Sequence, residues 1–170
     1  MGRSFVATAA ESFQSTLREL GLTRVSPDVG DPAKLGRRAA LVAAAEAVWT
    51  RHVGPLLDAK QVQELLGVDT RQAVSDLRAR RRLLGLPKGS GRVVYPAFQF
   101  GDSGRPFEAL PQVLEVFEAR AHVDPWTIAS WFVTPQALLA RMTPAEWLAK
   151  GQDPVLVVRA ARRSAARLGR

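Results

Sequence analysis

The segment from residue 58 to residue 95 constrains the fold most, because its pattern combines two short helices, a tight turn between them and a hairpin. Asp58 can cap the first helix, with Gln61 three residues later reaching back to the cap. Gly67 then ends this helix. Its apolar residues recur at helical spacing and should face a core: Val62, Leu65 and Leu66.

A second helix follows after two or three residues, capped by Asp69 or Thr70. Its pattern divides it into two faces. The face expected to point inward holds Ala73, Val74 and Leu77, and the face expected to point outward holds Arg71, Gln72, Ser75 and Arg78. Such a close pair of helices is typical of a helix-turn-helix.

A β-hairpin is predicted next, from apolar, β-prone runs at residues 83–86 and 92–95 around a loop at residues 87–91. Its glycines permit positive φ, and Lys88 and Arg92 flank the tip. The whole segment therefore predicts a winged helix-turn-helix.

The outward face of the second helix is chemically suited to duplex DNA. Arg and Gln side chains can bond bidentately to guanine and adenine edges, Ser can pair with either base, and the arginines at 80–82 can hold phosphates. The alternative is an ordinary helical hairpin with a solvated basic face. The candidate DNA-binding residues are Arg71, Gln72, Ser75, Arg78, Arg80, Lys88 and Arg92.

The segment resembles the winged helix-turn-helix of the excisionase-like and MerR-like DNA-binding families. The resemblance is carried by three runs of sequence: LLDAKQVQELLGV, TRQAVSDLRARRRL and VVYPAFQF.

Charge is unevenly placed along this chain of 170 residues, whose net charge is +8. Residues 53–100 carry eight basic and four acidic side chains and residues 149–170 six and one, whereas residues 101–148 carry three and six. This distribution favours a polyanionic partner for the basic regions and another partner elsewhere.

The 46% share of hydrophobic residues is enough for a packed core, and the chain has no cysteine, which excludes disulfides and thiolate metal sites. No apolar run is long enough for a signal peptide or a membrane span. We expect a cytoplasmic protein without membrane contact.

The N-terminal part predicts a helical arm over residues 1–54. An apolar stripe predicts a helix ending at Gly21, and the pair at 31–32 predicts the start of a second helix that runs to about His52. The arm either packs as plain core or holds two copies together, since helix-turn-helix proteins commonly bind paired half-sites as homodimers.

A turn-rich linker at residues 101–106 predicts a boundary between a DNA-binding domain at 55–102 and a helical domain at 103–170. In the latter, four Asp-Pro or Thr-Pro pairs each predict a capped helix start, at Asp124, Thr134, Thr143 and Asp153. The expected fold is therefore mainly α: a helical N-terminal arm, a winged helix-turn-helix with a small β-hairpin, and a C-terminal bundle of short helices.

The run DPWTIASWFVTPQALLARMTPAEWLAKGQDPVLVVRAA, residues 124–161, resembles the toxin-binding domain of Xre/MbcA/ParS-type antitoxins. The matching residues are Trp131, Pro135, Leu139, Thr143, Pro144, Trp147, Leu148, Gly151, Val157 and Val158. Gln136 stands where the family usually has Asn, and Ala140-Arg141 stand where it often has glycines. The resemblance implies a partner, a RES-domain toxin that degrades NAD, and repression of the operon that encodes the pair.

The candidate toxin-binding residues are Trp131, Trp147, Arg159, Arg162, Arg163 and Arg167. A domain of this size cannot bury all of its tryptophans, so one or two should remain as partner anchors. The four arginines share a helical face. They either form a solvated helix end, enter a toxin pocket shaped for the phosphates of NAD, or contact DNA phosphates.

No set of residues with catalytic or metal-binding spacing occurs: His52 and His122 lie far apart, and there is no phosphate-binding loop or nucleophile elbow. We therefore expect no enzyme activity and no cofactor. The first functional hypothesis is an antitoxin that binds an operator and neutralises a RES-type toxin. The alternatives are a stand-alone winged regulator whose C-terminal domain dimerises or senses a ligand, and a small enzyme whose residues escape recognition.

Overall fold

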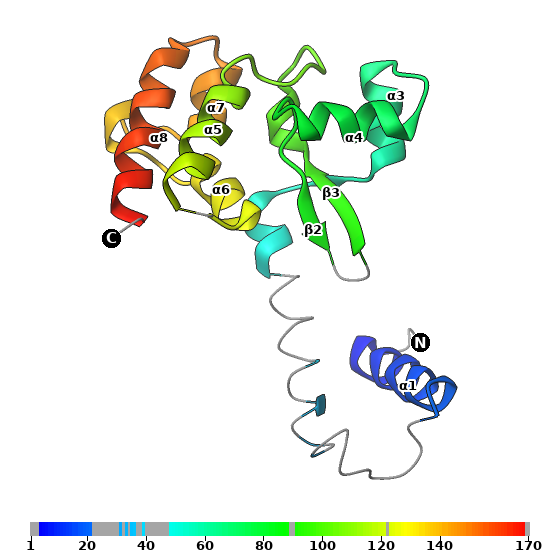
Figure 1. Cartoon of the computed structure of the whole chain (residues 1–170). Coiled ribbons are helices and arrows are strands. Elements are labelled where there is room, and N and C mark those ends of the chain that lie inside the picture. Colours follow the sequence, from blue (N-terminus) through cyan, green and yellow to red (C-terminus); the bar gives the residue numbers. More distant parts are fainter. Residues whose placement is uncertain are drawn as a thin grey trace. The chain divides into compact units, whose positions relative to one another are not determined.

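The computed structural model describes residues 4–21, 31, 33, 35–36, 39, 48–88, 91–121 and 123–168 (Figure 1). The chain divides into two compact units, residues 1–46 and residues 47–170. The first unit contains helix α1 (Phe5–Glu19), which ends before Gly21 as predicted. Most of the second predicted helix lies outside the described residues, although residues 48–53 are helical.

The helix-turn-helix forms as predicted, from α3 (Ala59–Leu66) and α4 (Arg71–Ala79). Leu65, which was expected to face the core, is instead 45% exposed. Asp58 and Gln61 form a reciprocal capping box on α3, and Gly67 ends it with a φ of 64°. Thr70, rather than Asp69, caps α4 by accepting a hydrogen bond from the backbone N–H of Ala73. Local capping therefore fixes both ends of the turn before any tertiary contact is considered.

The wing is part of a three-stranded antiparallel sheet in the order β1-β3-β2. The strands are β1 (Leu56–Leu57), β2 (Leu86–Lys88) and β3 (Arg92–Pro96). The sequence pattern did not indicate β1, and it was wrong in placing the first wing strand at 83–86.

A buried glutamine explains why the first wing strand begins late. The Gln99 side chain, fully buried, accepts a hydrogen bond from the Leu84 N–H at 2.8 Å and donates to the Leu84 carbonyl at 3.1 Å. It also donates to the Pro96 carbonyl at 3.0 Å. Because this side chain satisfies both backbone groups of Leu84, the segment is buried without a strand partner.

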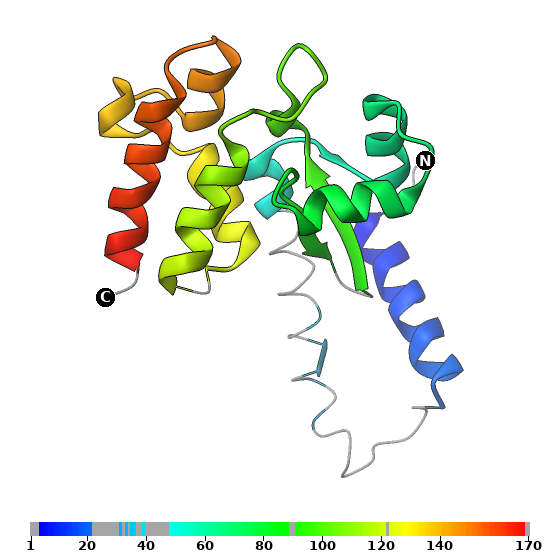
Figure 2. The same ribbon diagram turned by 45° about the horizontal axis from the view of Figure 1, so that its top comes forward.

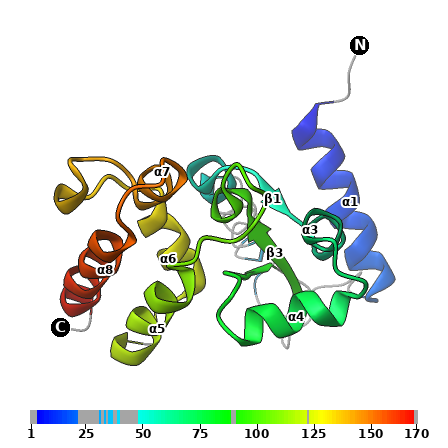
Figure 3. The same cartoon turned by 90° about the horizontal axis from the view of Figure 1, so that it is seen from above.

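Strand β3 separates two hydrophobic cores, and its side chains alternate between them as period 2 requires. Tyr95 packs in the helix-turn-helix core, whose buried members are Val62, Val74, Leu83, Tyr95 and Phe100. Val94 packs against the C-terminal core, which also takes in Val53, Leu84 and Leu86. In Figure 3, β3 lies between α3 and α4 on one side and α6 on the other.

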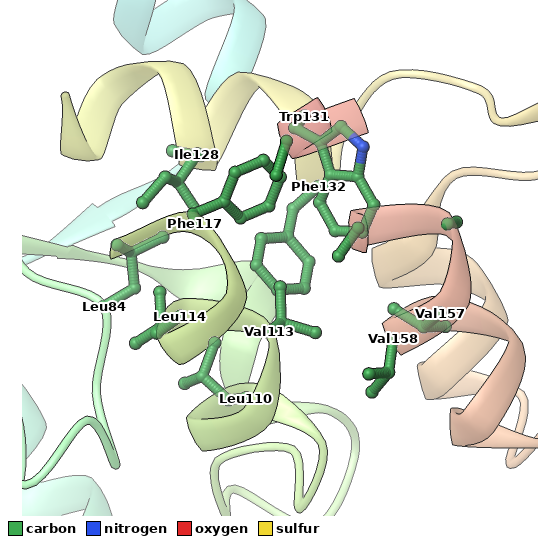
Figure 4. Close-up of a cluster of buried hydrophobic side chains, with 14 of the residues drawn as sticks. Leu84, Leu110, Val113, Leu114, Phe117, Ile128, Trp131, Phe132, Val157 and Val158 are labelled. Carbon is green, nitrogen blue, oxygen red and sulfur yellow. The ribbon is translucent and has the colours of Figure 1, made fainter. Parts of the chain in front are cut away.

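The C-terminal core is built by α5 (Leu110–Ala121), α6 (Pro125–Phe132), α7 (Pro144–Ala149) and α8 (Pro154–Leu168). Figures 1 and 2 show α5 and α8 side by side. Figure 4 shows Leu84 projecting toward the side chains of α5, and Phe117 close to Ile128 and Trp131. The boundary predicted at 101–106 falls inside the second compact unit.

Three of the four predicted caps begin helices: Asp124, Thr143 with Glu146, and Asp153 each accept a backbone hydrogen bond from the first turn. Thr134 does not. Its hydroxyl donates to the Ser130 carbonyl at 2.7 Å, and the short 3-10 turn Ala137–Leu139 begins after Gln136. This prediction was wrong because the hydroxyl serves the end of α6 instead of a new helix.

Across the described part of the chain, no helix has both the length and the apolar character needed to cross a membrane.

Candidate nucleic-acid interface

Helix α4 presents a polar face on the side away from the helix-turn-helix core. Val74 is fully buried, whereas Arg71, Gln72 and Arg78 are exposed and Ser75 is half-buried. This division of α4 into buried and exposed side chains follows the helical periodicity predicted from the sequence. The predicted base-reading residues therefore lie on one outward surface, beginning at the first turn of the helix.

The Gln72 side chain is held by a neighbour that the sequence interpretation left out. Its Nε2 donates a hydrogen bond to Oδ1 of Asp76, one turn along α4, at 2.9 Å. The spacing of four residues was visible in the sequence and is one at which helical side chains meet. The outward surface of α4 thus includes a carboxylate.

Arg78 lies along the wing and not over the first turn of α4. A Cβ at Gly85 would stand 2.6 Å from the Arg78 Cδ and 2.8 Å from a methyl carbon of Val93, so the missing side chain leaves room for the arginine stem. Burial raises the pKa of the Tyr95 hydroxyl, and the charge of Arg78 opposes that rise. Arg78 is therefore an exposed side chain beside the wing.

The three arginines after α4 have different surroundings. Arg80 and Arg82 are exposed. Arg81 adopts a φ of 59° and its Nε pairs with the Glu118 carboxylate of α5, which raises the pKa of the guanidinium. The phosphate contact expected of all three arginines therefore suits Arg80 and Arg82 better, because a carboxylate already faces Arg81.

Two cations stand directly opposite each other at the end of the wing, where the register pairs Lys88 with Arg92. The end of the wing therefore brings two positive charges close together. Strand β2 is anchored next to this end: the Trp126 indole donates to the Pro87 carbonyl at 2.9 Å, and Trp126 packs on Trp49 with ring centroids 6.0 Å apart.

The candidate toxin-binding residues divide into buried and exposed groups. Trp131 is only 8% exposed, and its indole donates to the Ser164 hydroxyl at 2.9 Å. Trp147 is half-buried and donates to the Asp153 carbonyl at 2.9 Å. Arg159, Arg162, Arg163 and Arg167 are all exposed on α8. The surface therefore offers the arginines and part of Trp147 to a partner, but not Trp131.

The turn before α7 has a left-handed backbone at Ala140 and Arg141, the two positions where Xre/MbcA/ParS-type antitoxins often have glycine. Ala140 has a φ of 51° and Arg141 a φ of 65°. Such conformations cost a non-glycine residue about 1 kcal/mol or more each. Leu139, fully buried, and the hydrogen bond from the Gln136 N–H to the Met142 carbonyl at 3.0 Å hold the turn closed.

A cavity of about 890 Å³ opens between the helix-turn-helix and the α7–α8 junction. Its lining includes Leu66, Leu77, Arg82, Phe107, Leu148 and Pro154.

Among the described side chains, no group of three or more His, Cys, Asp or Glu could hold a metal ion. His52 instead lies 2.8 Å from the Ser130 hydroxyl, and His122 is outside the described residues.

Comparison with known proteins gives one similar fold. No family model and no curated protein matches this chain. The chain is similar to a solved structure described as "NMR structure of Rv2175c", with a TM-score of 0.55 and 27% identity over 65% of this chain and 81% of that one. That likeness supports the fold.

Proposed function

We propose that this chain is a DNA-binding transcription regulator that reads duplex DNA with α4 and holds its backbone with the wing. The observation that carries the proposal is the outward surface of α4, where exposed Arg71 and Gln72 stand on the first turn of a helix that Thr70 caps. The first turn of the second helix is the part that reaches base edges in helix-turn-helix proteins. This function places the protein in the cytoplasm.

Binding would combine a specific and a non-specific term. A bidentate contact from Arg71 or Gln72 to a base edge contributes about 1 to 3 kcal/mol of discrimination. Lys88 and Arg92 at the wing, and Arg80 at the end of α4, would add phosphate contacts that carry no sequence information.

The test is selection of duplexes from a randomised pool with the full chain, followed by titration of the selected duplex. Arg71→Ala should weaken binding to it by roughly 5- to 150-fold and relax one base position. The exposed cation Lys150, at the end of α7, gives a matched control in Lys150→Ala. Failure to enrich any sequence, or an Arg71→Ala variant that keeps affinity and preference, would refute the proposal.

The finer proposal is that the regulator is an antitoxin whose C-terminal helices bind a RES-type toxin. Two observations favour it: the exposed arginine face of α8, and the left-handed turn at Ala140-Arg141, where the family that the chain resembles often has glycines. The alternative is a stand-alone regulator that dimerises or senses a ligand, for which the cavity beside Arg82 provides a place. A RES-type gene beside this one favours the antitoxin.

Co-expression and pull-down with the neighbouring gene product tests the antitoxin proposal. The four α8 arginines should be replaced by Gln rather than deleted, because Ser164 holds Trp131 and Ala165 is buried. Lost toxin neutralisation with unchanged DNA affinity supports a role in the toxin pocket. Lost DNA affinity alone supports phosphate contact, and no change in either leaves a solvated helix end.

The homodimer remains part of the proposal. Sedimentation of the full chain alone and with the selected duplex would show whether one or two copies bind, and a selected site with two half-sites would support a dimer.

A further inference from the structure

We infer that Asp76 is a positioning residue that presets the Gln72 amide to select adenine. This inference rests on the proposed DNA binding by α4 and assigns a base class to one residue of that surface. It begins from one hydrogen bond between the two side chains, Gln72 Nε2 to Asp76 Oδ1 at 2.9 Å.

The contact constrains the amide without hiding it. Gln72 and Asp76 lie one turn apart on α4, and both are exposed, so the hydrogen bond runs along the surface of the helix. An ionised carboxylate only accepts hydrogen bonds, so the atom of Gln72 that faces it must be the nitrogen. The partner therefore fixes which end of the amide faces Asp76.

The remaining groups of the amide form an adenine-reading pair. A Gln amide has two N–H donors and one carbonyl acceptor. With one N–H held by Asp76, the other N–H and Oε1 remain to face a base. Adenine offers N7 as an acceptor and its N6 amino group as a donor, which matches this pair.

The same orientation disfavours guanine. Guanine presents two acceptors in the major groove, N7 and O6, so Oε1 of the held amide would meet an acceptor. An amide without Asp76 can rotate and offer its two N–H groups instead. Asp76 thus converts a side chain able to adapt to either purine into one that prefers adenine.

Two other roles for Asp76 predict different results. As a simple surface hydrogen bond on α4, it would affect binding to all sequences equally. As a direct reader, its carboxylate would accept from the amino group of cytosine and so affect a different base position.

The experiment compares base preferences of full-length variants on randomised duplexes. Gln72→Ala first identifies the position that Gln72 reads. Asp76→Ala should then lower the adenine-to-guanine ratio at that position about tenfold and leave other positions unchanged. Asp76→Asn keeps an oxygen acceptor for Gln72 and should retain most of the preference. In the Gln72→Ala background, Asp76→Ala should have no further effect there.

Glu64→Ala is the matched control, because Glu64 is an exposed carboxylate that pairs with Lys60 one turn away on α3. Thermal melting shows whether each variant folds. Any of three results would overturn the inference alone. These are an unchanged adenine-to-guanine ratio after Asp76→Ala, a uniform loss of affinity over all sequences, and a change of preference at a position that Gln72→Ala does not affect. A wild-type chain that selects no duplex would overturn the proposed function together with it.

Discussion

Arg81, which follows the C-cap of the proposed recognition helix, pairs with Glu118 on α5 while its backbone holds a left-handed conformation. The Arg82 N–H donates to the Leu77 carbonyl at 2.8 Å and the Arg81 N–H to the Arg78 carbonyl at 3.0 Å, a helix-end arrangement that usually has glycine in this place. The ion pair thus joins the end of α4 to the C-terminal helices at a position where arginine is strained.

Separate substitutions at Arg81 should distinguish strain from charge. We expect Arg81→Gly to melt about 2 to 4 °C above Arg81→Ala, because both lose the ion pair but only glycine relieves the positive φ. Glu118→Gln should lower the melting temperature of the wild type in low salt and less in high salt. Equal melting of Arg81→Gly and Arg81→Ala would show that the backbone there is unstrained.

Substitution of Gln99 should lower the free energy of unfolding more than substitution of most other polar residues. Gln99→Leu leaves the Leu84 N–H, the Leu84 carbonyl and the Pro96 carbonyl without their partner, and we expect a loss of about 3 kcal/mol in the free energy of unfolding. Urea denaturation measures the loss. Gln112→Leu, at an exposed position on α5, should change stability by less than about 0.5 kcal/mol. A similarly small effect at Gln99 would show that the buried groups find other partners.

The sequence predicts the elements whose signals are local. The capping pairs at Asp58 and Thr143 and the positive-φ Gly67 define helix ends within a few residues, and the structure confirms them. The sequence does not reveal β1, because its two residues become a strand only by pairing with Pro96 and Tyr95 far along the chain.

Long-range contacts also limit what could be predicted of the candidate site. Outward Arg71 and Gln72 follow from helical periodicity, but the pairing of Arg81 with Glu118 and the passage of Arg78 over Gly85 depend on tertiary packing. Trp131 is a similar case: its aromatic character marks it as an anchor, and only the fold places it in a core.

Stability should fall at high pH because of Tyr95. Burial raises the pKa of its hydroxyl above the ordinary value of 10.0, so the folded state keeps the proton longer than the unfolded state. The contribution of protonated Tyr95 to the stability of the fold is complete below pH 10 and is lost as pH rises through the folded-state pKa. Tyr95 is the single tyrosine, so phenolate absorbance follows it alone.

The measurement is urea unfolding between about pH 8 and pH 11, with Tyr95→Phe as the reference that removes the other titrating groups from the comparison. The wild type should lose stability relative to Tyr95→Phe above pH 10. An identical pH dependence of the two proteins would contradict the raised pKa.

The C-terminal helices should not be stable as residues 103–170 alone, although the sequence places a domain boundary there. Val53, Leu84 and Leu86 belong to the C-terminal core and would be missing. Losing three such contacts removes roughly 5 kcal/mol of apolar burial, comparable with the whole stability of a small domain. Circular dichroism during heating should show no cooperative transition for 103–170 and a clear one for 47–170. A cooperative transition in the shorter fragment would show an independent core.

The salt dependence of affinity for the selected duplex tests the central claim, DNA binding by α4 and the wing, most directly. We predict that Lys88→Ala and Arg92→Ala each reduce the slope of log affinity against log salt concentration by about 1 and keep the base preference. Arg71→Ala should change the preference instead, and Lys150→Ala should change neither. Wing variants that bind with the wild-type slope, together with an Arg71→Ala variant of unchanged preference, would contradict the account.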